Sequence, residues 1–193
     1  DTYGGQNWID QNCIPTSGND RCGVHTNSGV QNFWFYLLTV GGSGTNDIGQ
    51  PYSVSGLGML KASQIAFRNN VVYLGRSSNY QAARFYAIRS AIDLFGACSP
   101  EVASVTNAWH AVGVGKAYSP GVSADFVSLL DTSFCSLPAR VEFDSDGSNA
   151  ISFLWSFGDA TSSTLADPVH FYTSYGNYTV KLQVNGAGCG NDT

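Results

Sequence analysis

The sequence predicts two domains, an all-α helical bundle lobe followed by an all-β sandwich. From about Asn27 to about residue 115, apolar side chains recur every three or four residues, as on the buried face of a helix. After about Ala117 they alternate with polar side chains, which is typical of half-buried strands. Turn clusters such as DSDGSN and GDATSST then recur about every 8 to 15 residues, which is typical of a small sandwich. The stretch 116–123, KAYSPGVS, has the composition of a short linker, so we expect domains at 1–116 and 123–193.

Composition excludes several classes of protein. The 193 residues are only 12% charged and carry a net charge of −5, so neither a nucleic-acid-binding surface nor an anionic-membrane surface is expected. A hydrophobic content of 43% is enough to fill a core, which excludes a fully disordered chain. No apolar run reaches the ~18 residues of a membrane-spanning helix. The chain begins at Asp1 without a basic and apolar leader, so we expect it to be processed or to be a fragment of something longer.

The five cysteines are spaced for disulfides rather than for zinc. None of them forms a close pair of the CxxC type. Low Lys with abundant Asn, Ser, Thr and Gly is typical of a secreted bacterial protein, and disulfides form in that compartment. We expect one bond between Cys13 and Cys22, which flank a turn, and one between Cys135 and Cys189 at two ends of the sandwich. Cys98, at a corner between helices, is then expected to be free.

The first helix is expected after an irregular, polar segment at 1–27. It should run to Gly41-Gly42, and Asn27 or Ser28 can cap its start. Its inner face consists of Val30, Phe33, Trp34, Leu37 and Leu38. Aromatic residues at 35 and 36 fill the other side, so the helix is expected to be buried nearly all round.

A glycine-rich loop is expected at 41–56, and three more helices should follow it. Two of them are expected at roughly 55–69 and 79–95. The last begins with Ser99, Pro100 and Glu101, which supply a cap, a proline at the first position and an acid in the first turn. Gly96 is suited to the end of the third helix, and glycines at 113 and 115 end the fourth.

Strands are expected in the second half at two clear alternations. One includes Val141 and Phe143, and the other consists of Tyr178, Val180, Leu182 and Val184. The segments ISFLWSFGD (151–159) and VHFYTSYGN (169–177) lie between them.

The residues before the first helix form a recognisable motif. The string Asp20-Arg21-Cys22-Gly23-Val24-His25-Thr26-Asn27-Ser28-Gly29 resembles the signature D-x-x-G-V-H-x-N-S-G of the thermolysin family. The resemblance continues through 52–68 and 78–115, and so covers the helical C-terminal lobe of that family. It implies that His25 hydrogen-bonds the oxyanion of a tetrahedral intermediate and that Asp20 orients His25. A donor aimed at developing charge lowers such a barrier by a few kcal/mol, and a carboxylate on the other ring nitrogen favours the charged imidazole.

The zinc-binding part of that family has no counterpart in this sequence. Its ligands lie on HExxH and on a later Glu, and the sequence contains no HExxH. The other histidines, His110 and His170, are 60 residues apart and have no ligand spacing. We therefore expect zinc in the full-length parent, with its ligands outside this chain, and no zinc bound to the chain itself.

The second half resembles the PKD domain, an immunoglobulin-like sandwich. Three stretches are similar to its motifs, namely 155–159 (WSFGD), 168–172 (PVHFY) and 175–184 (YGNYTVKLQV). Ala160 occupies the position of a usual glycine, so that turn is expected to differ slightly. Tyr178 is expected to act like a tyrosine corner and His170 to be a framework residue. Asp144, Asp146 and Asn149 suggest at most a weak calcium loop, because the EF-hand spacing fails.

These patterns lead to one leading function and two alternatives. The leading interpretation is a fragment of a secreted zinc metalloendopeptidase that acts on proteins or peptides together with an N-terminal catalytic half, the isolated fragment being inactive. The first alternative is a non-catalytic adhesion module that binds protein or polysaccharide through an aromatic-rich surface on 151–178. In the second alternative the PKD half is only a spacer.

Overall fold

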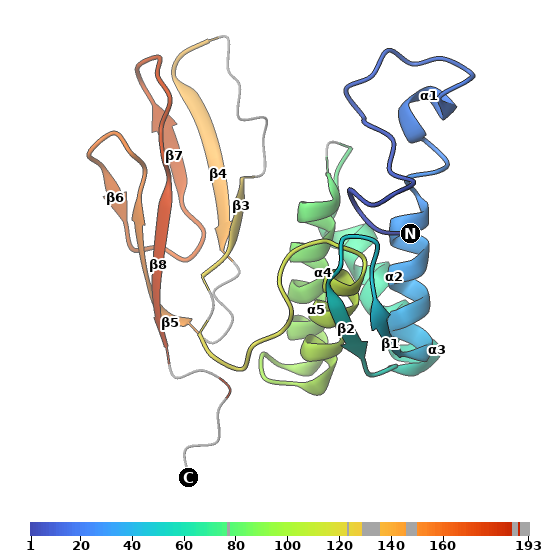
Figure 1. Cartoon of the computed structure of the whole chain (residues 1–193). Coiled ribbons are helices and arrows are strands. Elements are labelled where there is room, and N and C mark those ends of the chain that lie inside the picture. Colours follow the sequence, from blue (N-terminus) through green and yellow to red (C-terminus); the bar gives the residue numbers. More distant parts are fainter. Residues whose placement is uncertain (77, 123, 129–135, 146–149, 187–188, 190–193) are drawn as a thin grey trace. The chain divides into compact units, whose positions relative to one another are not determined.

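The computed structural model describes residues 1–76, 78–122, 124–128, 136–145, 150–186 and 189. The chain forms two compact units (Figure 1). The first, called the helical unit below, consists of Asp1–Leu74 and Tyr86–Tyr118, and the second, called the sandwich unit, of Gly75–Phe85 and Ser119–Thr193. The predicted order of a helical lobe followed by a β-sandwich is confirmed.

The helical elements are α1 (Asp20–Gly23), α2 (Gly29–Val40), α3 (Gly58–Arg68), the π-helical turn η1 (Asn69–Tyr73), α4 (Tyr80–Phe95) and α5 (Pro100–Ala111). Trp34 on α2 and Trp109 on α5 are buried and stack with 4.7 Å between ring centroids. Helix α2 packs against α3 and α5 because its predicted inner face is apolar. Ser99 caps α5 as predicted, its side chain accepting from the backbone N–H of Val102.

Helix α2 is less buried than its sequence predicts. The side chains of Tyr36 and Val40 are 53% and 62% exposed, so burial nearly all round is wrong. The residues on the opposite face, Val30, Trp34, Leu37 and Leu38, are buried. One apolar stripe is therefore enough to dock α2, and the aromatic residues beyond it lie partly or largely in solvent.

The expected loop at 41–56 contains a β-hairpin. Strands β1 (Gly42–Thr45) and β2 (Pro51–Val54) pair antiparallel, with Gly42 opposite Val54. The turn is closed by Asn46, whose backbone N–H donates to the Gln50 carbonyl while its side chain accepts from the Gln50 N–H. Strand β1 is exposed throughout and rich in glycine, so it lacks the apolar alternation by which strands are predicted.

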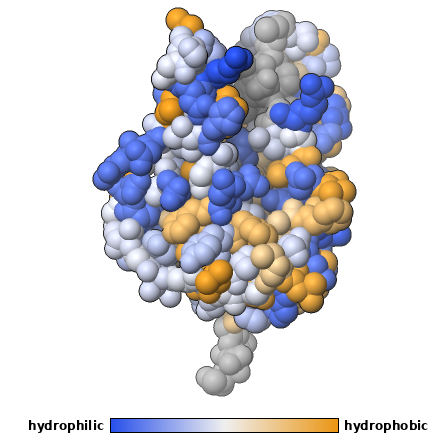
Figure 2. Space-filling view, turned by 90° about the vertical axis from the view of Figure 1, so that its right-hand side faces the viewer, coloured by the Kyte–Doolittle hydropathy of each residue, from blue (hydrophilic) through white to orange (hydrophobic). Residues whose placement is uncertain are grey.

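Helix α3 leaves large apolar side chains exposed. Met59, Leu60, Phe67, Val71 and Val72, on α3 and η1, are 55% to 73% exposed. Figure 2, which looks from the side where α2 and α3 lie in Figure 1, shows apolar residues set among hydrophilic ones. Only Ala62 and Ile65 of α3 are buried, so this helix docks by a narrow face.

Among the described residues, the strands of the sandwich unit form two three-stranded antiparallel sheets. Their orders are β3-β4-β7 and β6-β5-β8. The strands are β3 (Phe126–Ser128), β4 (Ala139–Ser145), β5 (Ala150–Ser156), β6 (Ser162–Ser163), β7 (Val169–Tyr172) and β8 (Lys181–Gly186). Trp155 and Phe143 lie in the core between them, and Tyr178 packs against it although β8 begins only at Lys181. The Tyr178 hydroxyl donates to the Ser174 carbonyl at 2.9 Å, the contact expected of a tyrosine corner.

The turn after β5 depends on two left-handed residues. Gly158 has a φ of 85°, and a Cβ there would lie 2.8 Å from the backbone nitrogen of Thr179. Ala160 occupies the position where the PKD domain usually has glycine, and its φ is 68°. The backbone of this turn therefore stays in the left-handed region in spite of the alanine, at the steric cost that a Cβ brings there.

One of the cysteine expectations is wrong. A disulfide joins Cys13 to Cys22, the pair that the sequence analysis selected. Cys98, expected to be free, is disulfide-bonded, as is Cys189. Pairing requires two Cα atoms within about 7 Å, and the position of Cys98 along the chain does not reveal which atoms approach it. Cys135, the expected partner of Cys189, lies outside the described residues.

In the part of the chain that the structure describes, no helix is both long and apolar enough to cross a membrane.

Candidate active-site loop

The segment α1 winds in the left-handed sense. Its φ angles are 52° at Asp20, 52° at Arg21, 64° at Cys22 and 83° at Gly23. Left-handed backbone costs a non-glycine residue about 1–2 kcal/mol, so three such residues in succession need support from other groups. Glycine is required at the fourth position, because a Cβ on Gly23 would lie 2.5 Å from the side-chain nitrogen of Asn27.

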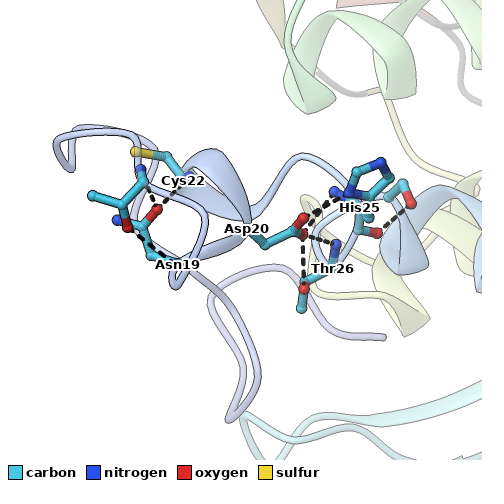
Figure 3. Close-up of polar contacts among 7 residues, drawn as sticks. Asn19, Asp20, Cys22, His25 and Thr26 are labelled. Atoms are coloured by element: carbon cyan, nitrogen blue, oxygen red, sulfur yellow. Dashed lines mark hydrogen bonds and ion pairs between the residues drawn. The ribbon is translucent and has the colours of Figure 1, made fainter.

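A disulfide and an asparagine supply that support. The Cys13–Cys22 bond ties the turn to the preceding segment, with a Cα–Cα distance of 5.7 Å. Asn19 Oδ1 accepts from the backbone N–H groups of Thr16 at 2.8 Å and Cys22 at 3.3 Å. Asn19 Nδ2 donates to the Ile14 carbonyl at 2.9 Å. The turn is thus held on both sides of Asp20 (Figure 3).

Both oxygens of the Asp20 carboxylate accept hydrogen bonds, and the donors belong to His25 and Thr26 (Figure 3). Asp20 Oδ1 lies 2.6 Å from His25 Nδ1. Asp20 Oδ2 accepts from the backbone N–H of His25 at 2.8 Å, from that of Thr26 at 2.7 Å and from the Thr26 hydroxyl at 3.0 Å. The structure therefore brings the two predicted site residues, Asp20 and His25, into direct contact.

These contacts stabilise the ionised form of Asp20. The hydrogen bond from the His25 ring, followed by the one from the Thr26 N–H, holds the pKa of Asp20 well below its ordinary value. Asp20 is therefore a carboxylate at neutral pH, and the His25 nitrogen that faces it, Nδ1, must be the donor. The proton on Nδ1 leaves Nε2 as the free end of the ring.

The His25 ring is open to solvent. Its side chain is 87% exposed, against 25% for Asp20. Among the described residues, Nε2 has no hydrogen-bond partner. An imidazole fixed at one nitrogen and exposed at the other can donate a hydrogen bond to an anionic atom when it is protonated on both, and can accept one when it is neutral.

The residues after His25 fasten the loop, but not by capping α2. The Asn27 side chain accepts from the Ile9 N–H at 3.0 Å and donates to the Ile9 carbonyl at 2.9 Å. The Ser28 hydroxyl donates to the His25 carbonyl at 2.5 Å and makes no cap bond to the helix. The predicted cap is therefore wrong, because the histidine loop and the N-terminal segment offer these side chains other partners.

Two residues of the site were not selected from the sequence, Asn19 and Thr26. Both are polar and lie directly beside the predicted pair, which is a weak signal by itself. The hydrogen bonds of Thr26 form because the left-handed turn directs Asp20 toward the residues five and six positions later. Asn19 instead bonds to Ile14, Thr16 and Cys22 around the turn.

The remaining histidines lie in other settings. His110 Nδ1 is 3.1 Å from the Gly115 carbonyl at the end of α5. His170 Nε2 is 2.7 Å from Asp159 Oδ2, and its ring stacks on Phe157 with 4.2 Å between centroids. These contacts fit the framework role expected for His170.

A metal site does not form from the described side chains. No three His, Cys, Asp or Glu residues come together in that part of the chain. Of the three residues considered for calcium, Asp146 and Asn149 lie outside the described residues.

Comparison with known proteins assigns the loop to a known family domain. Residues 3–114 match the family described as the thermolysin metallopeptidase, alpha-helical domain, and include Asp20 and His25. The chain belongs to the thermolysin metallopeptidase family. Residues 130–193 match the PKD domain, so a thermolysin-type helical domain is followed by a PKD domain, as the sequence motifs implied.

The relatives of this thermolysin-family chain are much longer than the chain itself. Bacillolysin of Bacillus caldolyticus and thermolysin of Alicyclobacillus acidocaldarius are each 42% identical over 99 residues, which cover 51% of this chain and 17% of each relative. The transglutaminase-activating metalloprotease of Streptomyces mobaraensis is 38% identical over 116 residues, 55% of this chain and 15% of that protein. The chain thus spans less than a fifth of the length of these relatives.

Proposed function

We propose that this chain is part of a secreted zinc metalloendopeptidase and that His25 stabilises the oxyanion formed when a peptide bond is attacked. The observation that carries this proposal is the hydrogen bond between Asp20 and His25 Nδ1, with the other end of the ring exposed. Membership of the thermolysin metallopeptidase family supports peptide-bond hydrolysis as the reaction and proteins or peptides as the substrates. The Cys13–Cys22 disulfide supports a secreted location.

In this proposal the chain contributes electrostatic stabilisation. Asp20 is ionised and accepts from Nδ1–H, so in the form of His25 that is protonated on both nitrogens the Nε2–H is the one directed at solvent. The Nε2–H then donates to the carbonyl oxygen as that oxygen becomes negative, so the interaction is stronger in the transition state than with the bound substrate. Asp20 acts as a positioning residue, because it touches His25 and not the substrate.

Zinc is assigned to the rest of the protease. The described residues bring no three ligand-type side chains together and do not fit a zinc site. We place the zinc ligands and the general base in the N-terminal catalytic half, outside this chain. It follows that the isolated chain is inactive.

The test is a kinetic comparison in the complete protease. His25→Ala should lower kcat by about 10²–10³-fold, the usual cost of one oxyanion donor, with a much smaller change in KM. His110→Ala, which removes a histidine bonded only at the end of α5, is the control and should leave both constants near wild type. A wild-type kcat for His25→Ala would refute the assignment.

We propose a second function for the sandwich unit, contact with polymeric protein substrate. Phe171 and Tyr175 are 50% and 72% exposed, and both lie in the aromatic-rich stretch 151–178. Exposed aromatic rings provide a large apolar contact area at low entropic cost. The full chain should therefore be retained on an insoluble protein, less so when both residues are changed to Ala, whereas Tyr36→Ala, an exposed aromatic of α2, should have no effect. Equal retention of the three proteins would exclude this surface.

A further inference from the structure

The hydroxyl of Thr26 makes a contact that the backbone of the loop cannot supply. Two of the three donors to Asp20 Oδ2 are the backbone N–H groups of His25 and Thr26, which most sequences would provide. The third is the Thr26 hydroxyl at 3.0 Å. We propose that Thr26 is a positioning residue, whose hydroxyl holds the Asp20 carboxylate in the orientation by which Asp20 holds His25.

The argument begins with the unequal use of the two carboxylate oxygens. Oδ2 accepts three hydrogen bonds, and Oδ1 accepts the one from His25 Nδ1 at 2.6 Å. Thr26 donates to Oδ2 from both its backbone N–H and its hydroxyl. These two hydrogen bonds close a small ring that contains Oδ2 and atoms of Thr26 alone. A carboxylate held in this way cannot rotate freely about its Cβ–Cγ bond, so Oδ1 stays directed at the imidazole.

Packing does not provide this restraint. The His25 side chain is 87% exposed and that of Asp20 is 25% exposed, so water competes for both partners. Local donors therefore decide how long Oδ1 and Nδ1 stay aligned. The Thr26 hydroxyl makes the smallest contribution to the lowered pKa of Asp20, and the His25 ring makes the largest. For that reason we assign the hydroxyl a role in orientation rather than in ionisation.

The first test needs only this chain. It contains three histidines, so the nitrogen resonances of the His25 ring can be assigned by comparison with His25→Ala. In wild type, neutral His25 should carry its proton on Nδ1. In Thr26→Val, which keeps the branched shape but lacks the hydroxyl, the Nε2–H tautomer should become detectable, and Thr26→Ser should restore the wild-type spectrum. Thr26→Ala is a second variant without the hydroxyl, for use if the valine variant does not fold.

A matched control is available in the same unit. The Thr39 hydroxyl donates to the Phe35 carbonyl within α2, so Thr39→Val makes the same chemical change away from the site. Its His25 spectrum should equal that of wild type. If both variants that lack the Thr26 hydroxyl also give the wild-type spectrum, the proposal is overturned, whatever His25 does in catalysis.

The second test rests on the proposed function and uses the complete protease. Thr26→Val should lower kcat about three- to tenfold with KM unchanged, which corresponds to roughly 0.7–1.4 kcal/mol in the barrier, and Thr26→Ser should recover most of it. The two proposals fail differently. A wild-type kcat in His25→Ala refutes the oxyanion role and leaves the spectroscopic test intact. A large loss in His25→Ala with a wild-type kcat in Thr26→Val overturns the role of Thr26 alone.

Discussion

Asp20 is bonded twice to His25, once through the ring and once through the backbone. Its Oδ1 faces His25 Nδ1 at 2.6 Å, and its Oδ2 accepts the His25 N–H at 2.8 Å. One carboxylate therefore fixes both the position of the residue and the direction of its side chain.

Asp20→Asn in the complete protease should lower kcat by roughly 10- to 100-fold, less than His25→Ala does. A neutral amide oxygen is a weaker acceptor for Nδ1–H than a carboxylate, so the ring is held less firmly, and groups that orient a functional side chain contribute about this much. Steady-state kinetics across pH would show the loss mainly in kcat. A loss larger than that of His25→Ala would mean that Asp20 has a role beyond positioning.

The isolated chain should bind no stoichiometric zinc and should not cleave casein. The described residues supply no group of three ligand-type side chains. Metal analysis after dialysis and a casein assay measure the two properties directly. About one zinc per chain, together with cleavage that a chelator blocks, would contradict the prediction.

Gly23→Ala should destabilise the helical unit by roughly 1–3 kcal/mol and weaken the Asp20–His25 contact. The backbone of Gly23 is left-handed, with a φ of 83°, and a Cβ would meet the Asn27 amide at 2.5 Å. Gly18→Ala is the control, since the nearest atom to a Cβ there is Thr16 Oγ1 at 3.9 Å. Thermal unfolding should separate the two variants, and equal melting temperatures would show that the turn relaxes without cost.

In acid, the sandwich unit should lose the stabilisation that the ionised Asp159 carboxylate contributes to the folded state. The Thr161 hydroxyl and the His170 ring, which both bond this carboxylate, are the main causes that lower its pKa from 3.8 to about 2. Because the folded state prefers the ionised form, this contribution is complete above about pH 5 and disappears as the pH falls toward 2.

Asp159→Asn should therefore be less stable than wild type near neutral pH, and the difference should shrink between about pH 5 and pH 2. Melting temperatures of the two proteins over that range measure it. Asp10→Asn, a change at an exposed carboxylate of the helical unit, is the control for the loss of one negative charge. A difference that stays constant down to pH 2 would assign the effect of Asp159 to packing instead.

Much of the fold could be predicted because the information is local. The apolar period of α2, the cap and proline at the start of α5 and the alternation in β4 each lie within a few residues. The hairpin of β1 and β2 escaped prediction because an exposed, glycine-rich strand has no apolar alternation. Its pairing depends on a turn at Asn46 that joins two weak segments.

By itself the sequence determined the order of a helical domain and a sandwich, the motif that contains Asp20 and His25, and the cysteines close enough to pair across a short loop. Only the tertiary structure decided that α1 is left-handed, that the Thr26 hydroxyl reaches Asp20, and that Cys98 is oxidised. The physical reason is the same in each case. Side-chain periodicity follows from the geometry of one element. The left-handed turn, the Thr26 bond and the Cys98 disulfide depend instead on contacts with residues outside any one element.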